Sequence, residues 1–296
     1  MRWRTAAEPG AGAAIEAHTL SSDTLILRQA LQQSAEAPLL YLLLGSDRAL
    51  LLDTGDQSSR GAFPLRETVD TLIERWLLRH PCDDYELVVA HTHAHGDHVA
   101  GDAQFTDRRF TRVVGHSAAE VAAFFGLENW PAGTAEFDLG GRVLQVIPAP
   151  GHHPSAVAIY DPSTQSLFTG DTVYPGRLYV ADFPAFEASL RTLCDFTAAQ
   201  PVRAVLGAHI EMSSRPGRDF PRGSRTHRNE APLPMTTADL HRIRAAAAQV
   251  ASHPGAHRFS NFIIWNGPCR AESARQAIRL LGSRLGGLWR RADAAG

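Results

Sequence analysis

The sequence AHTHAHGDH occupies residues 90–98 and brings four of the chain's 14 histidines together with an aspartate. It directly follows an apolar run at residues 87–90, which is typical of a strand that ends in a loop. Imidazole nitrogens and carboxylate oxygens are the ligands that zinc and its neighbouring metals select. Side chains two residues apart in extended backbone point the same way, so His93 and His95 can bind one ion while Asp97 and His98 reach a second. The stretch therefore predicts a metal site held by a rigid strand.

Further fragments with the same chemistry occur along the chain, each at or near a short apolar run. They read LLLDTG at residues 50–55, PGHHP at 150–154, LFTGD at 167–171 and LGAH at 206–209. The candidate ligands that they add are His152, Asp171 and His209. Two metals about 3.5–4 Å apart that share a carboxylate and a water are a recurrent hydrolytic arrangement.

The pattern His93-x-His95-x-Asp97-His98 resembles the signature of the metallo-β-lactamase superfamily, and the other fragments follow in the order that this family requires. The resemblance covers about residues 15 to 212. It implies a four-layer αββα sandwich with two metal ions. It implies that His93, His95 and His152 bind the first ion, that Asp97, His98 and His209 bind the second, and that Asp171 bridges them. Asp53, in the first fragment, usually has a structural role.

One departure from the family pattern concerns the third ligand. His153 stands where many relatives have a small hydroxyl residue, and Ser155 stands where they often have glycine. Two adjacent histidines leave open which of them binds the metal, and we assign His152. His116 and Glu211 are expected to be a surface residue and a structural residue, respectively.

The hydrophobic pattern by itself predicts a layered α/β fold, because strands and helices alternate and both carry apolar faces. Apolar runs predict strands at residues 24–29, 39–44, 49–52, 87–90, 112–114, 142–147, 156–160, 165–169 and 204–206. Helical spacing predicts helices at residues 65–80, 117–125, 186–197, 237–252 and 272–290, with a short one from about residue 99. We expect a catalytic domain over residues 1–235. Residues 236–296 form an appendage packed on the same domain, which can cap the sandwich, complete the pocket or form a homodimer.

Composition is that of a globular enzyme. A formal charge of −2 argues against a nucleic-acid surface, where phosphate contacts dominate affinity. No apolar run approaches the roughly 20 residues of a membrane span, and no signal peptide is visible at residues 1–12, so we expect a cytoplasmic protein without a membrane partner. Three widely spaced cysteines indicate no disulfide framework. All 29 basic residues are arginine, which excludes Schiff-base chemistry through a lysine.

The expected mechanism is attack by a metal-bridging hydroxide, because metal binding lowers the pKa of water from 15.7 to roughly 7. Zinc is the first expectation for both ions, with manganese or iron(II) as alternatives. Asp97 and Asp171 are the expected catalytic carboxylates. Residues 172–186 are rich in aromatic side chains and suit a pocket wall. There Tyr174, or else Tyr179, can donate a hydrogen bond to a carbonyl oxygen, as a tyrosine does in lactonases of this family.

Residues 210–235 are rich in proline and arginine and lack periodicity, which is typical of a lid, a binding loop or a disordered segment. Arginines there can clamp a carboxylate or a phosphate, or can simply be solvated. Arg215 and Arg218 are the first candidates for that binding role.

The ligand set separates the subfamilies that the resemblance brings in. Asp171 disfavours the β-lactamases proper, His95 disfavours flavodiiron oxidoreductases, and the lysine-free tail does not match the glutathione-binding domain of glyoxalase II. A mononuclear-iron persulfide dioxygenase remains an alternative, and a non-catalytic metal-binding interaction module is a second one. The sequence favours a metal-dependent hydrolase of a small-molecule ester, lactone or thioester.

Overall fold

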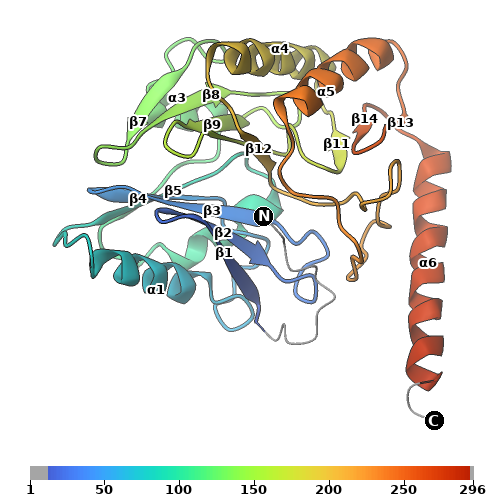
Figure 1. The fold of residues 1–296 in the computed structure, drawn as a ribbon, viewed down its shortest axis with the longest axis horizontal. Helices are drawn as coiled ribbons and strands as arrows, with labels where there is room; N and C mark the ends of the chain where they lie inside the picture. The colour runs from blue at the N-terminus through green and yellow to red at the C-terminus, as the bar shows by residue number, and fades with distance from the viewer. Residues whose placement is uncertain (1–12, 294–296) are drawn as a thin grey trace.

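The computed structural model describes residues 13–293 and the side chains of residues 13–282. Two mixed β-sheets lie face to face (Figure 1). The first contains β1 (Ile15–Ser21), β2 (Thr24–Gln29), β3 (Leu39–Leu44), β4 (Arg48–Leu52), β5 (Glu86–Ala90) and β6 (Thr111–Val113), in that order. The second has the order β12 (Ala204–Gly207), β10 (Ser166–Gly170), β9 (Val157–Asp161), β8 (Val143–Pro148) and β7 (Ala135–Asp138).

Helices cover the outer face of each sheet. Helix α1 (Leu65–Leu77) packs Val69 and Ile73 on the first sheet, in one apolar cluster with the residues of β3 and β5 that face the helix. Helices α4 (Phe183–Ala199) and α5 (Thr237–Val250) cover the second sheet (Figure 1). A third apolar cluster fills the space between the sheets. The four-layer αββα sandwich is therefore confirmed.

The central strands are apolar on both faces because both faces are covered. In β3, every side chain from Leu39 to Leu44 is buried, and alternate residues belong to the clusters on the two sides of the sheet. Strands β4, β5 and β6 run parallel, as do β10 and β12. Parallel strands buried on both faces are expected to carry such continuous apolar runs.

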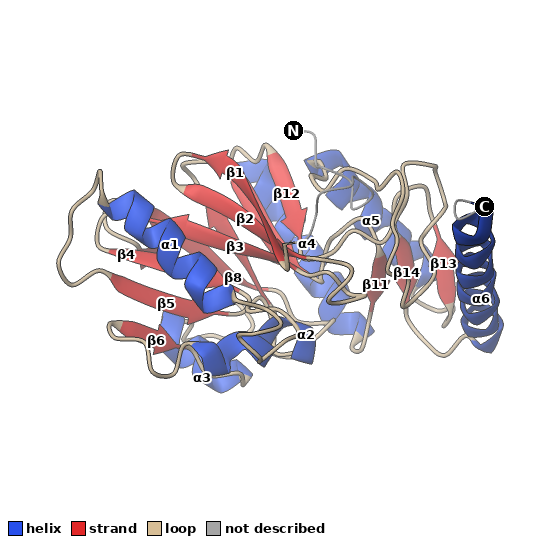
Figure 2. Cartoon of the chain, turned by 90° about the horizontal axis from the view of Figure 1, so that it is seen from below, coloured by secondary structure: helices blue, strands red, loops and turns tan. Residues whose placement is uncertain are grey.

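The C-terminal segment is built into the catalytic part of the chain through a third sheet. Strand β11 (Arg177–Tyr179) pairs with β14 (Ile263–Trp265), which pairs with β13 (Ala256–Arg258). Figure 2 shows this sheet beside α5 and α6 (Arg270–Asp293), at the end of the molecule away from α1. Residues from both sides of position 235 thus share one sheet.

Residues 210–235 form an irregular but well-held segment. Isolated bridges join Met212 to Asp219, Ser213 to Glu230 and Val205 to Met235. The buried pair of Arg28 and Glu230, at 2.6 Å, fastens the segment to β2. These contacts make the segment a fixed wall, and the expectation of a loop without regular secondary structure is confirmed.

Periodicity missed or displaced several elements, including the seven-residue β1 and some short ones. Strands β1, β7 and β11 were not predicted, and β11 and β7 have only three and four residues. The short helix expected from residue 99 begins earlier, as α2 (Gly96–Val99), and continues as a 3₁₀ turn (Ala100–Gln104). Helix α3 (Ala118–Phe125) has the predicted N-cap at Ser117, with a complete capping box to Glu120.

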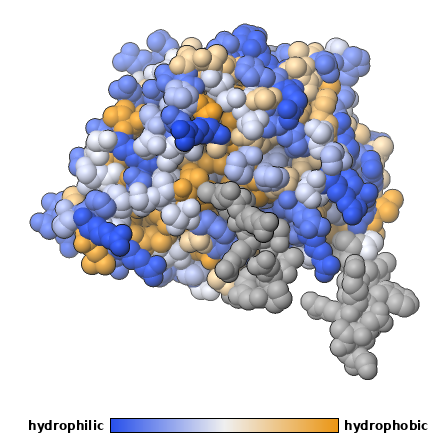
Figure 3. Space-filling view, viewed as in Figure 1, coloured by the Kyte–Doolittle hydropathy of each residue, from blue (hydrophilic) through white to orange (hydrophobic). Residues whose placement is uncertain are grey.

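The outer surface mixes hydrophilic and hydrophobic residues on the face shown in Figure 3. Within residues 13–293, no helix combines the length and the apolar character that a membrane span requires.

Candidate metal centre

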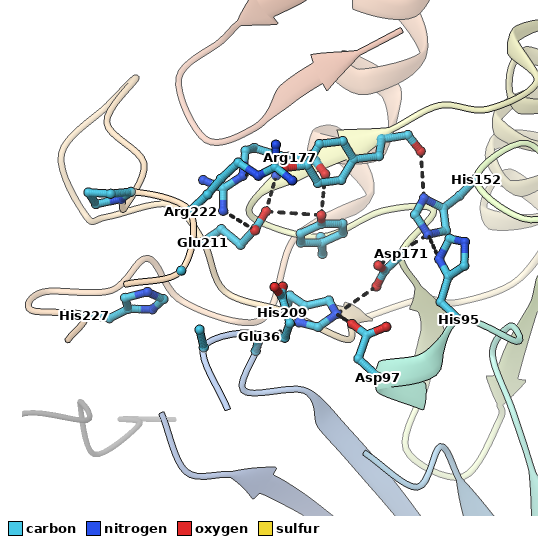
Figure 4. Close-up of a pocket in the computed structure, with 15 residues that line it drawn as sticks. Glu36, His95, Asp97, His152, Asp171, Arg177, His209, Glu211, Arg222 and His227 are labelled. Atoms are coloured by element: carbon cyan, nitrogen blue, oxygen red, sulfur yellow. Dashed lines mark hydrogen bonds and ion pairs between the residues drawn. The ribbon is translucent and has the colours of Figure 1, made fainter. Parts of the chain in front are cut away.

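All seven predicted ligands meet at one end of the sandwich. His93 and His95 lie in the loop after β5, and Asp97 and His98 lie in the short helix α2. His152 lies in the turn after β8, and Asp171 and His209 follow β10 and β12. Gly170 lets Asp171 approach the loop, because its φ is +50° and an added Cβ would lie 2.5 Å from the Cβ of Thr92. The backbone thus brings four distant segments to the same site (Figure 4).

The first group consists of three imidazoles. His93 Nε2 lies 3.1 Å from His95 Nδ1, and His152 Nε2 lies 2.9 Å from the same atom. Asp171 Oδ2 is 3.5 Å from His152 Nε2 and 4.0 Å from His93 Nε2. Donor atoms at this spacing can surround one ion of zinc's size, since zinc binds imidazole nitrogen at about 2.0–2.1 Å.

The second group shares Asp171 with the first. His209 Nε2 lies 3.4 Å from Asp97 Oδ2 and 3.4 Å from Asp171 Oδ1, and His98 Nε2 lies 3.4 Å from His209 Nε2. Asp171 Oδ1 is buried and has no hydrogen-bond partner in the described part of the chain. A buried carboxylate oxygen without a donor is costly unless a cation faces it. The two oxygens of Asp171 therefore fit a bridge between two metals.

The nitrogens that do not face the site are held by hydrogen bonds. His98 Nδ1 contacts Asp53 Oδ2 at 2.9 Å, His152 Nδ1 contacts the Tyr179 carbonyl at 2.7 Å, and His209 Nδ1 contacts the Glu36 carbonyl at 2.9 Å. Such outer contacts fix the ring orientation and leave the other nitrogen free for a metal. The donor set thus fits two divalent ions in chemistry and in orientation.

The adjacent residues His152 and His153 have different contacts. His152 directs Nε2 to His95, whereas His153 Nδ1 contacts the hydroxyl of Ser155 at 3.0 Å and accepts its backbone N–H. Burial and the nearby His95 and His152 lower the pKa of His153 to about 4, so it stays neutral at neutral pH. His152 is the histidine that joins the ligand group.

The charges of the ligand imidazoles are strongly coupled. Burial and the neighbouring His98 lower the pKa of His93. Burial also opposes charge on His98, but the carboxylates of Asp53 and Asp171 raise the pKa of His98 to about 9. Rings so close together cannot all be protonated without strong repulsion, and a divalent cation between their nitrogens satisfies the same carboxylates.

Asp53 supports the site from behind. It lies at the end of β4 with a φ of +70° and is fully buried. Its carboxylate accepts the backbone N–H of Thr92 at 2.7 Å in addition to contacting His98 Nδ1. The structural role expected for this residue agrees with these contacts.

We expect Asp53→Asn to weaken metal binding by roughly 10- to 100-fold, because the ring of His98 loses its charged partner. Competition with a chromophoric chelator measures this affinity. Asp107→Asn, which changes a carboxylate that is 67% exposed, is the matched control and should leave it unchanged. Equal metal affinity in both variants would show that Asp53 does not act on the metals.

The hydroxyl of Tyr174 forms its hydrogen bonds within the protein. The residue is 1% exposed, and its hydroxyl donates to the carbonyl of Arg177 and lies 3.2 Å from Glu211 Oε2. Its one proton is therefore committed within the protein, although the ring lines the pocket. Glu211 also accepts from the backbone and side chain of Arg177, which agrees with its expected structural role.

A pocket of about 260 Å³ opens over the ligands. Beyond the metal centre it is lined by Glu36, Arg177, Tyr179, Glu211, Arg222 and His227 (Figure 4). Arg215 and Arg218 do not line it and are exposed, so the arginines singled out from the sequence are not the ones at the site. Arg177 lies in β11, within the predicted aromatic wall, and Arg222 is one of several arginines of residues 210–235 that no local pattern in the sequence distinguishes.

A second histidine pair lies outside the seven ligands. Asp102 contacts His91 Nε2 and His116 Nε2, each at 2.8 Å, and accepts from the hydroxyl of Thr54 at 2.8 Å. His116 is nearly half exposed, as expected of a surface residue, but its contact with Asp102 was not foreseen. The three side chains tie the loop after β5 to the residues that follow β6.

Comparisons with known proteins agree with this geometry. The sequence pattern of the Metallo-beta-lactamase superfamily matches residues 36–221, and the chain belongs to this superfamily. Hydroxyacylglutathione hydrolase of Anaeromyxobacter dehalogenans is 34% identical over 134 residues, which are 45% of each chain. The enzyme of that name from Rhizobium meliloti is 31% identical over 144 residues, 47% of this chain and 53% of the relative. The similarity thus spans about half the length of these relatives.

Solved structures show the same fold. A metallo-β-lactamase from Pontibacter korlensis has a TM-score of 0.51 and 20% identity, covering 79% of this chain and 99% of that one. The DIM-1 metallo-β-lactamase has a TM-score of 0.52 and 15% identity, covering 80% of this chain and 98% of that one. This likeness concerns the architecture.

Proposed function

We propose that the protein is a dinuclear zinc hydrolase that cleaves a small-molecule ester, lactone or thioester. The observation that carries the proposal is Asp171, whose two oxygens face two separate groups of ligand atoms while Oδ1 has no other partner among the described residues. The relatives named hydroxyacylglutathione hydrolase give the thioester particular weight, although glutathione recognition is not implied by the part of the chain that matches them.

His93, His95 and His152 would hold one metal ion, and Asp97, His98 and His209 would hold another. Such ions would supply a hydroxide nucleophile at neutral pH and would polarise a substrate carbonyl. The protein's own contribution is to hold the reacting groups in place. Asp171 and the five ligand imidazoles fix the geometry. Three of these imidazoles are held by hydrogen bonds that Nδ1 donates to the Asp53 carboxylate and to the backbone carbonyls of Glu36 and Tyr179. Asp97 has a second carboxylate oxygen that can accept a hydrogen bond from the attacking water. Burial opposes ionisation of Asp97, but His209 and His98 hold its pKa below its usual range, so it is a carboxylate at neutral pH.

Tyr174 was the expected donor to the carbonyl oxygen. Because its hydroxyl donates a hydrogen bond to the backbone carbonyl of Arg177, we assign Tyr174 a positioning role, in which it orients β11 and Glu211 beside the metal site. Of the two tyrosines, Tyr179 is then the one whose hydroxyl can still donate into the pocket.

The alternative of a mononuclear-iron dioxygenase needs only one ligand group. The ligand atoms of the second group, Asp97, His98 and His209, also lie within 4.8 Å of one another, which supports two metals. The alternative of a non-catalytic module predicts missing ligands, and all seven converge here.

We expect two zinc ions per chain in protein purified without added metal, measured by elemental analysis. His98→Ala should reduce this to about one, because it removes a ligand of the second group only. One iron per chain without zinc would instead support the dioxygenase.

The reaction itself is tested by a panel of thioesters, lactones, aryl esters, phosphodiesters and β-lactams. We expect turnover of the carbonyl esters, thioesters or lactones, and little of the last two classes. Preference for phosphodiesters would contradict the proposed substrate class while leaving the metal site intact.

A further inference from the structure

The outer end of the pocket contains a guanidinium without an acidic partner. Arg222 lines the same pocket as the metal ligands, and within the described residues its side chain forms no ion pair. The guanidinium lies over two aromatic rings, at 5.6 Å from the Tyr179 centroid and 5.9 Å from the Trp265 centroid. Arg177, the other arginine of the pocket, is buried and already paired with Glu211 and Asp219. Arg222 is thus the cation that a ligand can reach.

A second donor lies beside it. The hydroxyl of Tyr179 accepts a hydrogen bond from Arg177 Nε at 3.1 Å, but its own proton has no acceptor in the part of the chain that the structure describes. A phenol keeps its proton at neutral pH, because its usual pKa is about 10. Because its oxygen is held by Arg177, the hydroxyl must donate toward the pocket or remain without a partner.

The backbone holds both donors in position. The N–H of Arg222 donates to Gln276 Oε1 at 3.2 Å, which joins the loop to α6. Three residues earlier, Asp219 is fully buried and binds Arg177, Arg258 and Arg279. Tyr179 is fixed by the pairing of β11 with β14. Donors on a rigid frame bind an anion with less loss of entropy than donors on a mobile loop.

The other side chains of the pocket favour an anion at the end where Arg222 lies. Glu36 contributes an acidic side chain next to His209, where its carboxylate would repel a second carboxylate (Figure 4). Trp265 and Tyr179 add an apolar groove that reaches His95 and His152. A substrate therefore meets a flat aromatic surface between the metals and the free donors.

We propose that Arg222 and Tyr179 form a clamp for a carboxylate of the substrate, at the far end of the pocket from the scissile carbonyl. This inference rests on the proposed hydrolase function and names its substrate class, a carboxylate-bearing ester, lactone or thioester. A guanidinium and one hydroxyl supply donors for the two oxygens of a carboxylate, and because a guanidinium also binds phosphate, the phosphate substrate in the test distinguishes the two.

The test compares substrates that share the scissile bond and differ at the other end, where one has a terminal carboxylate, one its neutral amide and one a phosphate monoester. We expect the wild-type holoenzyme to prefer the carboxylate. Arg222→Ala should raise KM for the carboxylate substrate by roughly 10- to 100-fold. The preference of the enzyme for the carboxylate over the amide should fall by the same factor, because one charge-assisted contact is lost. Tyr179→Phe should lower the same preference less, and Arg222→Lys should restore part of it.

Arg218→Ala is the matched control, because Arg218 is an exposed arginine of the same segment that does not line the pocket. It should leave the preference unchanged. An equal effect of Arg218→Ala and Arg222→Ala, or a wild-type preference for the amide or the phosphate, would overturn the clamp.

Binding of the carboxylate product separates failure of the clamp from failure of the proposed reaction. Isothermal titration calorimetry of the metal-loaded protein should show tighter binding of the dicarboxylate product to wild type than to Arg222→Ala. This holds even if none of the esters is cleaved. Equal affinities would contradict the clamp, whereas turnover of the neutral amide partner would still support the hydrolase.

Discussion

Asp171→Asn is expected to remove nearly all hydrolytic activity while the chain still folds. The substitution keeps the shape of the side chain, but it replaces one of the two negative oxygens that face the ligand groups with an amide. Losing an outer partner of a metal ligand typically costs 10–100-fold, so losing the bridging ligand should cost more than about 100-fold in kcat/KM. The variant should also bind fewer than two metals.

The measurement pairs turnover with metal content and circular dichroism. His116→Ala is a useful control, since it changes a histidine near the same loop that is not among the seven ligands. It should retain both metals and most activity. Wild-type turnover by Asp171→Asn on a confirmed substrate would show that the two-metal mechanism is wrong.

Arg142→Met is expected to lower the free energy of unfolding by about 3 kcal/mol without changing the metal site, because removal of one partner of a buried ion pair strands the other. The side chain of Arg142 pairs with Asp161 at 2.7 Å. It also donates to the carbonyls of Asp23 and Leu44, at 2.6 Å and 2.9 Å. It thereby joins the second sheet to the first.

The contacts of Arg142 lie at the end of the sandwich away from the metal site. Leu44 pairs with Ala49 at the start of β4, whereas the metal loop follows Ala90, which pairs with Leu52 at the end of β4. Urea denaturation of the metal-loaded protein gives the stability, and chelator competition gives the metal affinity. The double variant with Asp161→Asn should lose less than the sum of the two single losses, because the residues act as a pair. Unchanged stability of Arg142→Met would show that the contacts of Arg142 do not hold the two sheets together.

The sequence by itself determined the fold class and the candidate metal ligands. The ligands occupy fixed offsets next to short apolar strands, and in extended backbone those offsets dictate which side chains point together. Long helices and buried strands were predictable for a similar reason, since burial imposes a period that is visible within a few turns or pleats. The capping box of Ser117 and Glu120 is likewise a local signal, and the structure contains it.

Only the tertiary structure decided which other residues surround the metals. Arg222 and Arg218 have the same local chemistry, yet the path of an irregular segment places the first in the pocket and the second on the surface. Strand β11 became visible only through its pairing with β14, more than 80 positions further along the chain. The direction of the Tyr174 proton likewise depends on the Arg177 carbonyl beside it. Local spacing encodes the ligands of a metal, whereas the walls of a pocket are set by contacts between distant segments, which no short pattern in the sequence records.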